Sequence, residues 1–347
     1  LGSPHVSKPT LLIALTDGLG LGLLAFVIYA HWHNEDHPEI GLDAALQRPI
    51  DWWALAATVG LCAVSILITF YRWHVLVLAQ DLPFTIASAL RLGLIGLYWN
   101  TFLPGSIGGD IIKAAFITRE QSRRTVAVAT VLLDRVIGLC GLVWLVTLLG
   151  SFLNMIHVDE SAPIAADGRA VLRVILLVST TLSAASVTFW IVMGFFSEPW
   201  SARMADRLER LPKIGISVAE MWRAIWLYRR RGKSVALALS LAIVAHGGFV
   251  LTFFCAAHVL SPTSLPSLPA HYLIVPMGMA GQAIVPTPNG VGGGELVFGW
   301  LYQVIGFAFV AGALGSLVLR AATWLVALLG YFVYFRMKGA AASARDA

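Results

Sequence analysis

Two segments of this chain place a proline, a run of glycines and an acid inside sequence that is otherwise apolar. The first is LPGSIGGD at residues 103–110, and the second is TPNGVGGGE at residues 287–295. An arginine follows the acid of each segment by 25 positions, Arg135 in the first half and Arg320 in the second. A guanidinium binds a phosphate or a carboxylate through two parallel hydrogen bonds. Each set can therefore bind an anionic group, or its arginine can pair with its own acid.

The glycine and proline breaks indicate where such a site would lie. Interrupted backbone in a hydrocarbon layer persists only where it is buried in protein or lines a cavity. Broken segments at corresponding places in two halves of a membrane protein are typical of a transport site. The candidate substrate-binding residues are Asn100, Pro104, Gly108, Gly109, Asp110, Lys113 and Arg135 in the first half, and Gln282, Pro288, Asn289, Gly292, Glu295 and Arg320 in the second.

Each candidate also has a purely structural interpretation. Asp110 begins the helix expected over residues 111–118, where it can act as the N-cap. The free N–H groups at that helix start can equally bind a phosphate, which Lys113 could contact one turn later. The two arginines can form buried pairs that hold each hairpin to its neighbour. The amide side chains among the candidates are expected more often to satisfy the interrupted backbone than to bind a headgroup.

The composition indicates a membrane protein. Hydrophobic residues make up 58% of the 347 residues and charged residues only 12%, with a mean hydropathy of +0.79. A soluble domain carries roughly 25% charged residues. The net charge of +5 is modest and unevenly placed, so it indicates orientation and anionic lipid contact, without a nucleic-acid-binding arm.

Motifs for catalysis, cofactors or metals are missing from the sequence. Neither glycine run continues into a phosphate-binding loop or a dinucleotide fingerprint, and Ser106 lacks the G-x-S-x-G setting of a hydrolase nucleophile. The three cysteines form no C-x-x-C pair, and His31, His33 and His37 fit a solvated loop better than a zinc site. We therefore expect no enzyme activity, no cofactor and no metal.

The apolar spans predict an all-α polytopic membrane protein. A stretch of about 20 apolar residues is long enough to cross a bilayer as a helix. We expect the first span to be a retained helix, since no signal-peptide cleavage site follows it. The spans are residues 11–30, 53–71, 91–103, 125–152, 171–196, 234–260, 271–286, 296–309 and 310–335.

Loop charges predict how these spans are oriented. The loops at residues 31–51 and 151–170 are rich in acids, whereas residues 119–124 and 197–233 are rich in Arg and Lys. The positive-inside rule places the basic segments and both termini in the cytoplasm. Labelling of engineered cysteines from outside the cell tests this orientation.

That orientation requires two re-entrant hairpins. Residues 72–91 and 119–124 lie on the same side, so the chain between them must enter the membrane and return, with its turn at residues 104–109. By the same argument residues 271–309 enter and return from the opposite side, with the turn at residues 286–294. Two inverted repeats, each with a broken re-entrant hairpin, follow from this pattern.

The sequence predicts one transmembrane domain over residues 1–335. Repeat one covers about residues 11–196 and repeat two about residues 234–335. Between them, residues 197–233 form a basic amphipathic link, expected on the cytoplasmic membrane surface and broken near Pro212 and Gly215. Residues 336–347 form a short cytoplasmic tail.

Several charged and aromatic side chains outside the breaks are interpreted as membrane anchors. Arg72 and Arg91 are expected to snorkel to the cytoplasmic surface, and Asp134 is expected close to the interface. The tryptophans interpreted as interface anchors are Trp52, Trp53, Trp73, Trp99 and Trp200.

At these residues the chain resembles the transmembrane, flippase-like domain of lysylphosphatidylglycerol synthases, over about residues 72–335. Lys113 stands where the family favours Arg, and Asp134 where Glu is common, so both positions keep their charge. The resemblance rests on Arg72-Trp73, Asn100 to Pro104, Gly108-Gly109-Asp110-x-x-Lys113, Leu133-Asp134-Arg135-Val136, Pro286-x-Pro288-x-Gly290-x-Gly292, Glu295 and Arg320.

This resemblance implies a protein that moves lipids or lipid-linked molecules between leaflets, as a stand-alone member without the soluble synthase domain. We expect translocation or leaflet distribution of an anionic phospholipid or a polyprenyl-linked lipid in the plasma (bacterial inner) membrane. Movement would be downhill or ion-coupled, because the sequence has no ATP motif. The alternatives are an ion-coupled carrier of a small anionic solute and a non-transporting subunit of a separately encoded lipid-modifying enzyme. The lipid, the direction and the oligomeric state stay open.

Overall fold

A computed structural model describes residues 8–33, 41–101, 103, 108–152, 166–212, 215–260 and 264–343, and every regular element within these ranges is helical. The helices are α1 (Lys8–Ala30), α2 (Leu42–Leu46), α3 (Trp52–Leu78), α4 (Ile86–Asn100), α5 (Gly108–Glu120), α6 (Arg124–Phe152), α7 (Ala166–Phe195), α8 (Glu198–Glu209), α9 (Gly215–Arg230), α10 (Gly232–His258), α11 (Leu268–Ile284), the 3₁₀ helix η3 (Pro288–Gly290), α12 (Gly293–Val304) and α13 (Phe309–Ser343).

Five of the described helices are long and apolar enough to cross a membrane, namely α3, α6, α7, α10 and α13. The chain is thus an all-α, polytopic integral membrane protein, as the sequence predicts. The predicted spans correspond to helices, although α3 continues past residue 71 to Leu78. The boundary between α12 and α13, predicted between residues 309 and 310, falls at Gly306, whose φ of +86° ends one helix before the next begins.

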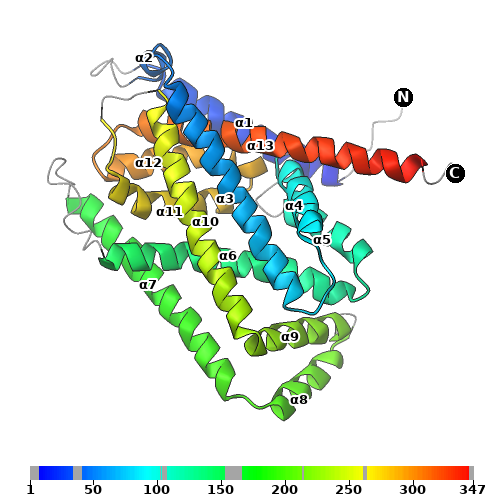
Figure 1. Cartoon of the computed structure of the whole chain (residues 1–347). Helices are drawn as coiled ribbons and strands as arrows, with labels where there is room; N and C mark the ends of the chain where they lie inside the picture. Colours follow the sequence, from blue (N-terminus) through cyan, green and yellow to red (C-terminus); the bar gives the residue numbers. More distant parts are fainter. Residues whose placement is uncertain are drawn as a thin grey trace.

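Helices α3 and α10 lie side by side along the length of the molecule (Figure 1). They approach closely because Gly248 of α10 faces the side chain of Ser65 on α3. Helix α6 packs on α10 through Gly141, where an added Cβ would collide with Ala242. Small residues at such crossings let membrane helices pack backbone to backbone. These helices form the scaffold on which both broken hairpins are mounted.

The two predicted breaks each separate the two halves of a packed helical hairpin. Helices α4 and α5 flank the first break, and α11 and α12 flank the second. Gly108 and Gly109 are the first residues of α5, while Gly292 is the N-cap of α12 and Gly293 its first residue. The prediction that these glycines lie at helix ends is confirmed, whereas Pro104 lies outside the described residues. The inverted orientation of the hairpins in the membrane remains a prediction.

Gly292 offers a direct test of the second break. Its φ is +77°, and an added Cβ would lie 2.5 Å from Leu23 Cβ and 2.6 Å from Gly20 O of α1. Gly306, with a similar φ of +86° but no atom within 4 Å of an added Cβ, is a matched control. Gly306→Ala is expected to destabilise by about 1–2 kcal/mol from backbone strain alone.

Gly292→Ala is expected to cost about 1–3 kcal/mol more than this control, because it also overpacks the contact with α1. Thermal unfolding of both variants in the same detergent measures the difference. Equal melting temperatures would show that α1 does not pack against the break.

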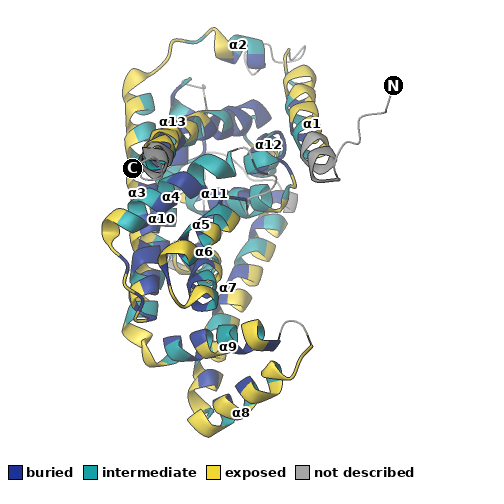
Figure 2. Ribbon diagram, turned by 90° about the vertical axis from the view of Figure 1, so that its right-hand side faces the viewer, coloured by how far each residue is buried: buried dark blue, intermediate teal, exposed yellow. Residues whose placement is uncertain are grey.

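The basic segment at residues 197–233 contains α8 and α9, which lie at the end of the molecule remote from α2 (Figure 1). The ring of Trp200 lies 5.8 Å from that of Trp222, whose Nε1 donates to Ser201 Oγ at 3.0 Å. Parts of the apolar sides of the two helices therefore face each other, while α8 exposes most of its outer surface (Figure 2). The division into two repeats joined by a membrane-surface link remains a prediction.

Candidate functional site

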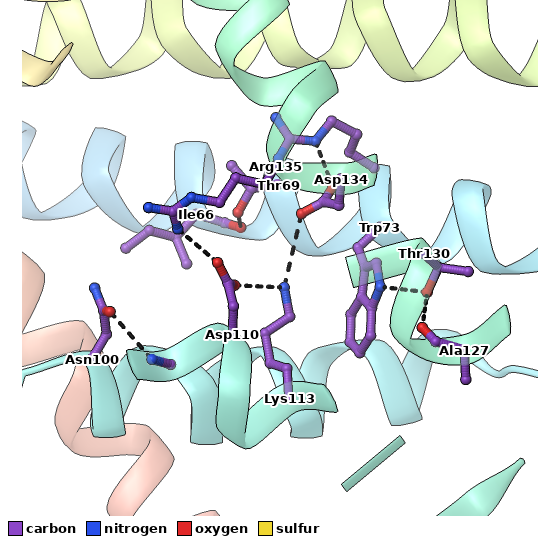
Figure 3. A network of polar contacts seen from close by, with 12 residues as sticks. Ile66, Thr69, Trp73, Asn100, Asp110, Lys113, Ala127, Thr130, Asp134 and Arg135 are labelled. Atoms are coloured by element: carbon purple, nitrogen blue, oxygen red, sulfur yellow. Dashed lines mark hydrogen bonds and ion pairs between the residues drawn. The ribbon is translucent and has the colours of Figure 1, made fainter. Parts of the chain in front are cut away.

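The first break begins a chain of five alternating charges, which we call the first cluster (Figure 3). Arg135 Nη1 of α6 lies 2.6 Å from Asp110 Oδ2 at the start of α5. Lys113 Nζ, one turn later, lies 3.7 Å from Asp110 Oδ1 and 3.8 Å from Asp134 Oδ2. Arg72 Nε of α3 donates to Asp134 Oδ1 at 2.8 Å. These five residues are three cations and two acids, so their formal charges sum to +1.

The first cluster passes from the protein interior toward its surface. The side chains of Arg72, Asp134 and Lys113 are 7–10% exposed. At the other end, Asp110 is 23% exposed and Arg135 is 34% exposed. An incoming anion would therefore meet Arg135 first.

Neighbouring residues fix the position of the Lys113 ammonium. Its Nζ lies 4.4 Å from the centre of the Trp73 ring, a distance suited to a cation–π interaction. Trp73 is fully buried and its Nε1 donates to Thr130 Oγ1 at 3.3 Å. The lysine stem runs past Gly96 of α4, where a Cβ would lie 2.6 Å from Lys113 Cγ. These contacts hold the Lys113 ammonium within the cluster.

The structure corrects two interpretations of residues near this cluster. Arg72 is buried in an ion pair with Asp134, so it does not snorkel to the surface. Trp73 is a core residue, unlike Trp52 and Trp53, which are exposed. Asp134 is buried within the protein, and its closeness to the membrane interface stays a prediction. Arg72 and Asp134 could be noticed in the sequence as charges in or beside apolar spans, but only the packing of α3 on α6 shows that they pair.

Asn100 has a structural role in the first break. Its Oδ1 accepts a hydrogen bond from Gly109 N at 3.3 Å, so the end of α4 satisfies a free N–H at the start of α5. An added Cβ on Gly109 would collide with the carbonyl oxygen of Gly96. The two helices can therefore cross this closely only with glycine at position 109.

The corresponding acid of the second break, Glu295, is completely buried. Its Oε1 accepts from Arg320 Nε at 2.9 Å, from Arg320 Nη2 at 2.7 Å and from Ser316 Oγ at 3.2 Å. Its Oε2 accepts from Gly292 N at 2.7 Å, which satisfies the first N–H of the break. We call Glu295 and Arg320 the second cluster, and it carries no net charge.

Arg320 also satisfies the carbonyl groups that the second break leaves free. Its Nη1 donates to Asn289 O at 2.7 Å and its Nη2 to Gly290 O at 3.2 Å. Gln282 Nε2 donates to the same Asn289 carbonyl at 3.1 Å. Asn289 itself has a φ of +49°, in η3, which begins at Pro288. Both predicted acid–arginine pairs exist, and the second one binds the break to α13.

A small cavity of about 190 Å³, lined by both apolar and polar side chains, adjoins the second cluster. Its polar lining includes Gln282, Asn289, Ser316 and Arg320. The residues that line it include none of the charged residues of the first cluster. Within the described part of the chain, no group of three or more His, Cys, Asp and Glu residues is placed to hold a metal ion.

Comparison with known protein families gives one match of nearly full length. The model of the family described as "Lysylphosphatidylglycerol synthase TM region" matches residues 12–330, which include both breaks and both clusters. No curated protein and no solved structure matches the chain.

Proposed function

This chain belongs to the family of the lysylphosphatidylglycerol synthase transmembrane region and has a lipid-related role in a membrane, and we propose that it moves a lipid with an anionic headgroup between the two leaflets. The lipid is an anionic phospholipid or a polyprenyl-linked lipid. The membrane is the plasma membrane, with both termini in the cytoplasm, and the chain is not itself an enzyme.

The observation that carries this proposal is the partly exposed Arg135 at one end of the first cluster, whose five residues have a formal net charge of +1. Ionisable residues inside a membrane are costly, so they mark a functional site by default. A phosphodiester carries one negative charge, which would neutralise the cluster. Arg135, the most exposed member, is also the side chain best suited to bind phosphate oxygens in pairs.

The geometry supports an exchange of partners at Asp110. In the resting arrangement Asp110 shares its two oxygens between Arg135 and Lys113. A phosphate that binds Arg135 would release Oδ2 while Asp110 keeps its interaction with Lys113. In this scheme each acid keeps at least one cationic partner. This is important because an unpaired buried charge destabilises the folded protein by several kcal/mol. Release of the headgroup on the other side would restore the Asp110–Arg135 pair.

Purified protein in liposomes tests this function. Phosphatidylglycerol with a fluorophore on one acyl chain is distributed over both leaflets, and a membrane-impermeant quencher reports the rate at which inner-leaflet probe becomes accessible. We expect the rate to exceed that of protein-free liposomes, for phosphatidylglycerol more than for zwitterionic phosphatidylcholine. Equal rates with and without protein, under imposed proton or sodium gradients of either sign, contradict the proposal.

The same preparation separates the two rival functions. Uptake of a radiolabelled small anion without lipid movement favours the solute carrier. A co-purifying lipid-modifying enzyme, together with inactive pure protein, favours the membrane subunit. A partly exposed arginine would also suit a carrier of small anions, so the uptake measurement is the one that separates these two functions.

A further inference from the structure

An apolar groove of about 660 Å³ runs between the end of α4 and the middle of α13. This volume lies within the range of roughly 300–1,000 Å³ found for small-ligand sites. The groove is lined by Tyr98, Thr101, Ala321, Trp324, Leu325 and Leu328, together with buried Ala327. Neither cluster contributes a charged side chain to this lining.

The groove offers almost only carbon to a ligand. The hydroxyl of Thr101 already donates to Leu97 O at 3.4 Å within its own helix. The larger side chains that α13 contributes, Trp324, Leu325 and Leu328, are aromatic or aliphatic and 40–54% exposed. Helix α13 is long and apolar enough to cross a membrane, where its exposed side chains would face hydrocarbon in place of water. The matching occupant is a flexible hydrocarbon chain.

The walls of the groove are held together at one end. An added Cβ on Gly330 of α13 would collide with the carbonyl oxygen of Leu94, so the two backbones are in contact there. Beside this contact the ring of Tyr98 lies 5.6 Å from that of Tyr331, and Trp99 lies 5.8 Å from Tyr334. The groove is therefore formed by packed helices and does not need a ligand to open it.

The groove also adjoins the cavity beside the second cluster. Arg320 and Thr323 line the cavity, and Ala321 and Trp324, each one position later on α13, line the groove. Successive residues of a helix point about 100° apart. The cavity and the groove therefore lie on adjoining faces of α13 and overlap along its length, an arrangement suited to an amphiphile.

We infer that the α4–α13 groove binds one acyl chain of the transported phospholipid, whose polar end faces the cavity of Gln282 and Asn289. That this phospholipid is transported rests on the proposed function, whereas binding of its acyl chain to the groove does not. This site is distinct from Arg135 and provides the lipid with a second resting place beside the second break.

Photolabelling in nanodiscs tests the site without requiring transport, because a nanodisc has no sealed compartment. Phosphatidylglycerol with a diazirine at the end of one acyl chain replaces a rising share of the lipid, and labelled peptides are mapped by mass spectrometry. We expect labelling of residues 98–101 and 321–328 to reach a plateau. Labelling of Leu177 on α7, which is highly exposed, should instead rise in proportion to the probe.

A matched pair of substitutions identifies the groove. Leu328, which lines it, is 51% exposed, and Leu329, which does not, is 55% exposed. Leu328→Trp should remove the saturable labelling, and Leu329→Trp should retain it. Proportional labelling in the wild-type protein would mean ordinary boundary lipid and overturn the inference, as would equal loss in both variants. Saturation by a diazirine-bearing isoprenoid phosphate but not by phosphatidylglycerol would overturn the acyl-chain assignment.

This result and the liposome result can fail separately. Saturable labelling without lipid movement refutes the proposed function and leaves an acyl-chain site. Lipid movement with only proportional labelling refutes the site and leaves the function.

Discussion

An Arg320→Gln variant is expected to lose about 3–5 kcal/mol of stability, because removal of one partner leaves the carboxylate of Glu295 charged and buried. The substitution also removes donors from the Asn289 and Gly290 carbonyls, which Arg320 satisfies in the second break. This is a large share of the 5–15 kcal/mol that typically stabilises a folded protein. We therefore expect little monodisperse protein after extraction.

Folded yield by fluorescence-detected size exclusion and thermal unfolding of the surviving protein measure this loss. The double variant Glu295→Gln/Arg320→Gln is the control, since removing both charges avoids the unpaired carboxylate. It should recover part of the yield lost in the single variant. If Arg320→Gln instead has wild-type stability and reduced lipid movement, Arg320 acts in transport and is not mainly structural.

An Arg135→Gln variant is expected to fold normally and to move anionic lipid about tenfold more slowly. A hydrogen bond to a charged group contributes about 1.5–3 kcal/mol, and we take the lower end because a third of this side chain is exposed. Asp110 keeps its interaction with Lys113 in the variant, so its charge is not left alone. The outcome should differ sharply from that of Arg320→Gln.

The rate of probe movement per folded molecule in liposomes is the relevant measurement. Arg124→Gln serves as the control, because Arg124 lies on the same helix and is exposed outside the cluster. It should leave the rate unchanged. If Arg135→Gln lowers the yield while the rate per folded molecule stays normal, the Asp110–Arg135 pair is structural as well.

Local sequence rules were sufficient to predict the class of protein and the positions at which its helices break. Long apolar runs must form helices in a membrane, because each backbone polar group has to be satisfied within its own segment. Proline and glycine interrupt that rule, so Gly108 and Gly292 could be placed at helix ends from the sequence. The acid–arginine pairs followed from charge in an apolar setting and from their repeated spacing.

The difference between the two pairs was decided only by tertiary structure. Both acids precede their arginines by 25 positions, yet Glu295 is sealed in the core and Asp110 is partly open. Burial depends on which other helices cover a position. The pattern of apolar and polar residues within one segment does not show which other helices pack over it.

The full membership of the first cluster also required the three-dimensional packing. Arg72 reaches Asp134 across 62 positions of sequence, through the packing of α3 on α6. The cation–π contact between Trp73 of α3 and Lys113 of α5 likewise joins two different helices. The sequence alone showed that charged residues lie within apolar spans. It also indicated that they need partners, because the cost of placing a charge in a membrane depends on residue type. Which charges pair with one another depends on distances that only the folded chain sets.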